Sequence, residues 1–137
     1  MFTEVYNISD DKEVTLTAYI PDISEEMQNM KVKPAVLILP GGAYKFCSDR
    51  EAEPIALAYL AKGFNAFILR YSLNEKAAFP TPLDDAKKAL GFIRSNAGIF
   101  FTDPQKIAVI GFSAGGHLAA ALSSMSEEKP NACILGY

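Results

Sequence analysis

The strongest restriction on the fold comes from four short runs that are apolar without alternation, at residues 35–39, 64–69, 107–110 and 132–135, with Asn65 as the one polar residue among them. A strand with one face in water alternates polar and apolar residues, so a run without alternation predicts a strand covered on both faces. The intervals between the runs carry helical patterns. Three successive strand, helix, strand units predict a doubly wound α/β fold with a mostly parallel sheet.

An antiparallel hairpin is predicted before these strands. Residues 13–20 alternate strictly, which indicates a strand that buries one face. The residues on that face are Val14, Leu16, Ala18 and Ile20. Residues 4–8 predict a second strand, and the polar residues 9–12 between them have the chemistry of a turn.

The first and third predicted helices cover residues 51–62 and about 114–124. The start of the first is ambiguous. Residues 48–51 resemble a capping box, whereas Pro54 favours the first helical turn over the helix interior.

The second predicted helix has clearer signals. Thr81 is expected to cap it, with Pro82 at its first position and with Asp84 and Asp85 as a solvated first turn. Its apolar stripe consists of Leu83, Ala86, Leu90, Ile93 and Ala97.

Composition excludes several classes of protein. The chain has 137 residues, half of them apolar and 21% charged, which excludes a disordered chain. A net charge of −3 with interspersed signs leaves no broad basic surface for nucleic acid or an anionic membrane. No apolar run approaches the roughly 20 residues of a membrane helix, and the amino terminus has no signal-peptide pattern, so we expect a soluble, cytoplasmic protein. Two cysteines and one histidine predict neither a disulfide framework nor a zinc site.

The candidate catalytic motif is Gly-Phe-Ser-Ala-Gly-Gly at residues 111–116, placed between a predicted strand and a predicted helix. This context is typical of a nucleophile elbow, in which Ser113 projects from a sharp, strained turn. Gly111 and Gly115 lack side chains that would collide across the turn, and Gly116 lets the helix approach the sheet. The alternative is a plain turn with a capping serine; the strand, the helix and the second glycine favour a nucleophile.

A second glycine-rich turn, Pro-Gly-Gly-Ala-Tyr at residues 40–44, leaves the first parallel strand at the same edge of the sheet. Acyl transfer forms an oxyanion, and the backbone N–H groups of Gly42, Ala43 and Ala114 are predicted to bind it. Each such donor contributes on the order of 10²- to 10³-fold in rate. The alternative is a glycine turn without a catalytic role.

The two turns and the strand pattern together resemble the α/β-hydrolase fold, and more closely its acetyl-xylan-esterase-like and hormone-sensitive-lipase-like carboxylesterases. The resemblance runs from about residue 14 to the last residue, and its matching segments are residues 40–44, 48–54, 69–71, 79–85, 103–104 and 111–118. The loop of that family often begins with His, whereas Pro40 takes this place here.

The resemblance implies a serine carboxylic-ester hydrolase that forms an acyl-enzyme on small acyl esters, with acetylated sugars and xylo-oligosaccharides among its substrates. The expected partner is therefore a small-molecule ester, with no metal or cofactor, and homo-oligomerisation stays open. A peptidase of the same fold and a noncatalytic module are the alternative functions.

The acid and base of a catalytic triad follow the serine in this fold. The acidic and histidine residues after Ser113 are only Glu127, Glu128 and His117. The glutamates lie at the helix end remote from the turn, and His117 is expected to pack beside it. We therefore expect residues 1–137 to be the amino-terminal part of one α/β-hydrolase domain, with the acid and base beyond residue 137.

Three further residues near the predicted site are assigned structural roles. Arg70 and Tyr71, at the carboxyl end of a strand, are expected to tie down loops, and lining of the pocket is the alternative. Cys47 has no evident cationic neighbour that would lower its pKa, so we expect it to serve in packing.

Overall fold

The apolar runs form parallel strands of one six-stranded sheet, in a computed structural model that describes residues 1–137. In chain order, the strands are β1 (Phe2–Asn7), β2 (Thr15–Ile20), β3 (Lys33–Leu39), β4 (Asn65–Arg70), β5 (Thr102–Gly111) and β6 (Ala132–Leu135). Their order across the sheet is β1-β2-β4-β3-β5-β6. The hairpin β1–β2 joins β4 antiparallel, and β3 to β6 are mutually parallel. This confirms the predicted mostly parallel α/β sheet with an antiparallel amino-terminal hairpin.

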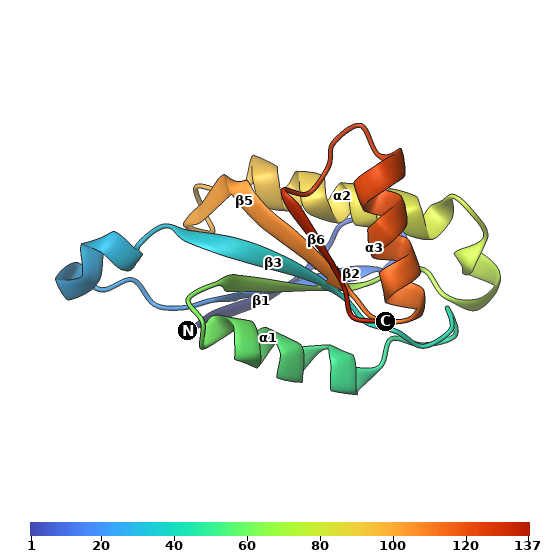
Figure 1. Cartoon of the computed structure of the whole chain (residues 1–137), viewed down its shortest axis with the longest axis horizontal. Coiled ribbons are helices and arrows are strands. Elements are labelled where there is room, and N and C mark those ends of the chain that lie inside the picture. Colours follow the sequence, from blue (N-terminus) through green and yellow to red (C-terminus); the bar gives the residue numbers. More distant parts are fainter.

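Helices cover both faces of the sheet, as a doubly wound fold requires (Figure 1). Helix α1 (Glu53–Leu60) lies on one face, and α2 (Thr81–Ser95) and α3 (Ala114–Met125) pack together on the other. Leu37 of β3 packs in the core under α2 and α3, whereas its neighbours Val36 and Ile38 pack on the side of α1. Successive strand residues point to opposite faces, which explains why this run contains no polar position.

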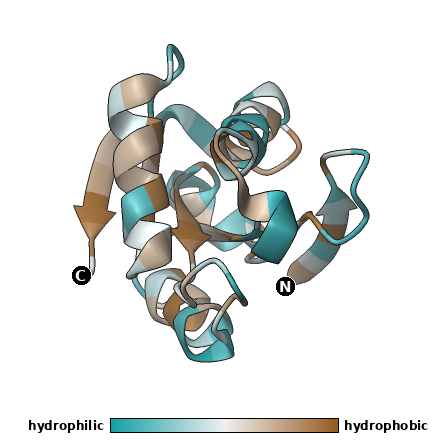
Figure 2. Cartoon of the chain, turned by 90° about the vertical axis from the view of Figure 1, so that its right-hand side faces the viewer, coloured by the Kyte–Doolittle hydropathy of each residue, from teal (hydrophilic) through white to brown (hydrophobic).

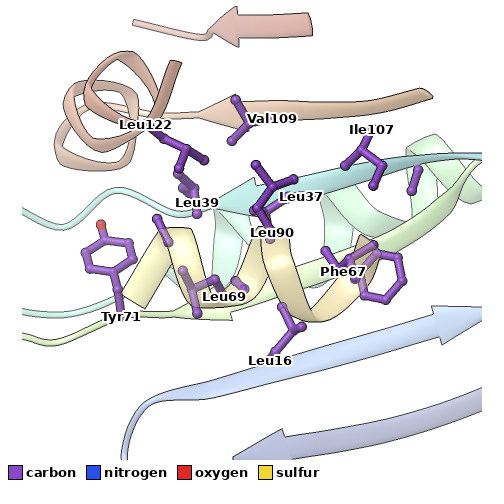
Figure 3. Packing of buried hydrophobic residues seen from close by; sticks show 14 of the residues in the cluster. Leu16, Leu37, Leu39, Phe67, Leu69, Tyr71, Leu90, Ile107, Val109 and Leu122 are labelled. Atoms are coloured by element: carbon purple, nitrogen blue, oxygen red, sulfur yellow. The ribbon is translucent and has the colours of Figure 1, made fainter. Parts of the chain in front are cut away.

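The larger core lies between the sheet and the pair α2 and α3 (Figure 3). Leu90 of α2 and Leu122 of α3 contribute to it, and both are fully buried. The apolar stripe predicted for the second helix is buried at every position, although its last residue, Ala97, lies just after α2 ends. Three alternating residues of β2 and Val14 just before it are buried as well. This packing gives the loops that leave the strands a rigid base.

Strand β6 differs from the other apolar runs. It pairs only with β5, lies at the edge of the sheet, and exposes all of its residues, although the run predicted a buried strand. Figure 2 shows this hydrophobic edge strand beside α3. Leu135 is 55% exposed.

Three short 3-10 helices, η1 (Glu25–Met30), η2 (Asp49–Glu51) and η3 (Asn74–Ala77), lie in the connections. The ambiguous start of the first predicted helix resolves into two elements, since η2 precedes α1 and Pro54 occupies the first turn of α1. The Ser48 side chain caps no amide there. No helix is both long and apolar enough to cross a bilayer.

The start of α2 corrects two predictions. Thr81 is the first helical residue and Pro80 takes the cap position, with no side-chain cap. Asp84 is exposed as expected, but Asp85 is buried, with 3% of its surface exposed. Asp85 is buried because Ser72, two residues after β4, offers it hydrogen-bond donors, which the sequence pattern alone does not reveal.

Candidate active site

Ser113 stands between the end of β5 and the start of α3 with φ 55° and ψ −117°. A positive φ is unfavourable for a residue with a side chain, and such strain is kept where neighbouring structure enforces it. The Ser113 side chain caps no amide of α3, and the residue is exposed. It lines a cavity of about 420 Å³, so its hydroxyl is accessible to a ligand.

Close backbone contacts enforce this turn. A Cβ on Gly111 would lie 2.1 Å from the Gly115 carbonyl oxygen, and a Cβ on Gly115 would lie 2.0 Å from that of Leu39. A Cβ on Gly116 would lie 2.6 Å from the carbonyl oxygen of Tyr137, just beyond β6. Any side chain at these three positions would therefore push the strand, the turn and the helix apart.

The second glycine-rich turn, residues 40–44, is called the glycine loop below, and it lies beside Ser113 in the same cavity. Gly42 has φ 147°, and a Cβ on it would lie 2.0 Å from the carbonyl oxygen of Phe46. Ala43 and Tyr44 follow with φ of 57° and 59°. Three consecutive positive φ angles make this a tightly specified backbone.

The amides predicted to bind the oxyanion do not donate hydrogen bonds within the fold. The N–H groups of Gly42 and Ala43 have no hydrogen-bond acceptor in the chain. The Ala114 N–H belongs to the first residue of α3, where no intrahelical acceptor exists. The Gly41 N–H differs, because it donates to Glu51 Oε1 over 3.1 Å.

The segment that follows β4 holds the glycine loop in place. The Tyr71 hydroxyl donates to the Pro40 carbonyl, and the Asn74 N–H donates to the Tyr44 carbonyl over 2.7 Å. Tyr71 is 2% exposed, and burial raises the pKa of its phenol far above the ordinary value, so the hydroxyl stays a donor.

Arg70 holds the chain just after the glycine loop. Its guanidinium donates to the Cys47 carbonyl over 3.3 Å and pairs with Asp49 over 2.9 Å. Arg70 and Tyr71 thus tie down loops, as predicted. Cys47 packs against the main core, and burial raises the pKa of its thiol, which agrees with a packing role.

His117 lies one turn into α3 and does not bond to the Ser113 hydroxyl. Its Nδ1 shares a hydrogen bond of 2.8 Å with the Tyr44 hydroxyl, and the two rings meet edge to face. The imidazole therefore connects α3 to the glycine loop. This agrees with the expectation that His117 packs beside the turn.

The two glutamates after Ser113 lie at the other end of α3. Glu128 pairs with Arg94 of α2 over 3.3 Å. Within the chain, no side chain hydrogen-bonds the Ser113 hydroxyl, and no group of three or more His, Cys, Asp and Glu side chains is placed to hold a metal.

Sequence reasoning missed the polar wall of the cavity. Ser48, Arg50 and Glu51 line it together with Tyr137 and the glycine loop. The sequence pattern of residues 48–51 favours a helix cap, and the signal for a role in the site is their place among the segments that resemble esterases. The hydrogen bonds of Glu51 to Gly41 and Tyr137 join residues that are 10 and 86 positions apart, so they depend on the tertiary fold.

Comparison with known proteins agrees with this geometry. Residues 21–133 match the BD-FAE family model. The acetylxylan esterase of Xylanibacter ruminicola is 30% identical over 134 residues, which cover 96% of this chain and 26% of that protein.

Solved structures extend the comparison to the fold. MGS-M1, an α/β-hydrolase enzyme from a Medee basin deep-sea metagenome library, is 57% identical with a TM-score of 0.97, and the match covers 98% of this chain and 56% of that one. The acetyl ester-xyloside bifunctional hydrolase from Caldicellulosiruptor lactoaceticus is 27% identical with a TM-score of 0.84, over 96% of this chain and 56% of that one. The chain thus spans about a quarter of the curated relative and just over half of each solved structure. It belongs to the BD-FAE family and is an acetyl-xylan-esterase-like α/β-hydrolase.

Proposed function

We propose that the protein is a serine carboxylic-ester hydrolase that works through an acyl-enzyme, with Ser113 as its nucleophile. The amides of Gly42, Ala43 and Ala114 bind the oxyanion. The general base and its acid partner come from outside residues 1–137.

In the acylation half of the reaction, Ser113 Oγ attacks the ester carbonyl carbon while the base takes the hydroxyl proton. The carbonyl π electrons move to oxygen and create a tetrahedral oxyanion, which the three amides stabilise. When the carbonyl re-forms, the bond to the alcohol oxygen breaks, and the protonated base gives its proton to that oxygen. The alcohol leaves, and the acyl group stays on Ser113.

In the deacylation half, water attacks the acyl carbon and the base takes a proton from the water. A second oxyanion forms in the same place. Its collapse breaks the bond to Ser113 Oγ, which regains a proton from the base, and the carboxylic acid leaves. The three amides thus act in both halves of the reaction.

The observation that carries this proposal is that an exposed serine with a strained backbone and unpaired amides line one cavity. Ser113 and the loop residues Gly42 and Ala43 share this cavity. Free donors fixed before the reaction do not have to reorganise when charge develops, which is why they stabilise a transition state so effectively.

The lining of the cavity supports small, polar esters as substrates. At about 420 Å³ it has room for a short acyl group or a sugar-sized alcohol, and Ser48 and Arg50 offer polar partners for hydroxyl groups. Two relatives are named as an acetylxylan esterase and as an acetyl ester-xyloside bifunctional hydrolase. We therefore propose acetylated sugars and xylo-oligosaccharides as the substrate class.

The test uses the full-length polypeptide that carries these residues. It is incubated with a fluorophosphonate probe and assayed for acetate release from acetylated xylo-oligosaccharides, before and after Ser113→Ala. The expected result is labelling at Ser113 and loss of at least about 10³-fold in kcat in the variant, since the nucleophile is removed. Unchanged turnover by Ser113→Ala would refute the proposal.

Two further outcomes separate the alternatives. Faster cleavage of dipeptides than of acetyl esters would make the protein a peptidase of the same fold. A folded protein that neither reacts with the probe nor hydrolyses either substrate would be a noncatalytic module.

A further inference from the structure

Glu51 of η2 is the carboxylate in the wall of the candidate active site, and both of its oxygens are engaged. Oε1 accepts the Gly41 N–H over 3.1 Å, and Oε2 accepts the hydroxyl of Tyr137. The residue is half-buried and lines the same cavity as Ser113. No hydrogen bond joins it to the Ser113 hydroxyl, which does not suit a general base.

Gly41 is enclosed between this carboxylate and the turn that carries the serine. A Cβ on Gly41 would lie 2.8 Å from Glu51 Oε1, 2.5 Å from the Phe112 carbonyl oxygen and 3.1 Å from the Cβ of Ser113. The Gly41 backbone thus touches the serine turn on one side and the carboxylate on the other. Because Gly42 and Ala43 follow directly, the position of Gly41 sets where their free amides lie.

Tyr137 extends the connection to the nucleophile itself. Its carbonyl accepts the Ser113 N–H over 3.0 Å, while its phenol donates to Glu51. The hydrogen bond to the carboxylate raises the pKa of the Tyr137 phenol, which keeps the phenol protonated and donating. One carboxylate therefore contacts both the glycine loop and the residue that holds the backbone of Ser113.

We propose that Glu51 is a positioning residue, which holds the glycine loop at the distance from Ser113 that the oxyanion requires. This inference rests on the proposed ester hydrolysis. An oxyanion forms only as the reaction proceeds, so a displaced loop should lower kcat and leave KM nearly unchanged.

The experiment compares Glu51→Ala and Glu51→Gln in the full-length polypeptide, with 4-nitrophenyl acetate as the substrate. Removal of a whole oxyanion donor costs on the order of 10²- to 10³-fold, so a displaced loop in Glu51→Ala should lower kcat by about tenfold or more, with KM within about threefold. Glu51→Gln keeps an amide oxygen that can accept the Gly41 N–H. Its kcat should stay within about threefold of the parent.

Glu53→Ala is the matched control. Glu53 lies two residues further on and also accepts a tyrosine hydroxyl, that of Tyr19 over 3.0 Å, yet it does not contact the glycine loop. Its kcat should equal that of the parent. Equal kcat losses in Glu51→Ala and Glu53→Ala would overturn the proposal, because general loosening would explain both. Equal losses in Glu51→Ala and Glu51→Gln would also overturn it, because charge and not the acceptor would then matter.

Amide hydrogen exchange tests the contact without relying on activity. Glu51→Ala should speed exchange at Gly41 by about tenfold or more, since losing one hydrogen bond removes on the order of 1.4 kcal/mol of protection. Unchanged exchange at Gly41 overturns the positioning role even in an active enzyme. If the parent protein shows no ester hydrolysis that is lost in Ser113→Ala, the proposed function is refuted. Faster exchange at Gly41 in the Glu51→Ala variant would then still support the contact between Glu51 and Gly41.

Discussion

Asp85 is the residue whose replacement most directly tests how the fold supports the site. It is 3% exposed, and its Oδ2 accepts the Ser72 N–H over 2.8 Å and the Ser72 hydroxyl over 2.6 Å. These bonds join the amino-terminal part of α2 to the segment just after β4. Ser72 directly follows Tyr71, whose hydroxyl holds the glycine loop, so the contact stabilises the chain next to the candidate site.

Asp85→Ala removes both bonds and leaves the buried Ser72 N–H without an acceptor. Hydrogen bonds to a charged group each contribute about 1.5 to 3 kcal/mol, so the loss of two should lower the free energy of unfolding by about 3 to 6 kcal/mol. Asp85→Asn keeps an oxygen that can accept, and should lose less. Urea denaturation followed by circular dichroism measures these differences.

Asp84→Ala is the matched control, because Asp84 lies in the same helical turn but is exposed, 4.0 Å from Lys87. It should cost less than about 1 kcal/mol, the usual size of a helix-dipole interaction. A double-mutant cycle with Ser72→Ala isolates the part that belongs to the hydroxyl. If Asp85→Ala and Asp84→Ala destabilise the protein equally, the buried contact does not carry the energy assigned to it.

Three further outcomes are expected. Gly115→Ala should prevent the serine turn from forming and abolish labelling by the fluorophosphonate probe. Gly98→Ala is the control, because a Cβ there meets nothing within 4 Å, and equal labelling of the two variants would contradict the steric reasoning. At pH 7.5, iodoacetamide should modify the exposed Cys133 before Cys47, whose pKa burial raises, and peptide mass analysis would detect the reverse order. The Glu13 N–H and Lys76 lower the pKa of Asp11 below its ordinary 3.8. The ionised Asp11 therefore stabilises the fold above pH 3.8, and this contribution is lost as the pH falls through the folded pKa. Asp11→Asn should lower the melting temperature at pH 6 and leave it unchanged at pH 2.

The elements of the fold could be predicted because their signals are local. Alternation in β2 and its lack in β3 report how many faces of each strand are covered, and neighbouring residues suffice to read them. The signal for the turn around Ser113 is equally local, since its glycines lie within three residues of the serine, although two of them face the distant Leu39 and Tyr137. The glycine loop was predicted in the same way.

The supports of the site could not be predicted from such patterns. The sequence around Asp85 is typical of the solvated start of a helix. Burial of the Asp85 side chain is favourable only because Ser72 lies beside it and donates hydrogen bonds. The sequence around Glu51 is typical of a helix cap, and only the structure shows that Glu51 accepts a hydrogen bond from Gly41.

The sequence alone thus determined which segments become strands and helices, and which turn presents the serine, because periodicity and backbone freedom act over a few residues. The tertiary structure decided which polar side chains hold that turn and the glycine loop in place. Tyr44 and His117, for example, are 73 positions apart along the chain. A hydrogen bond between such residues exists only after the sheet has assembled, so its partners cannot be identified from their neighbours in sequence.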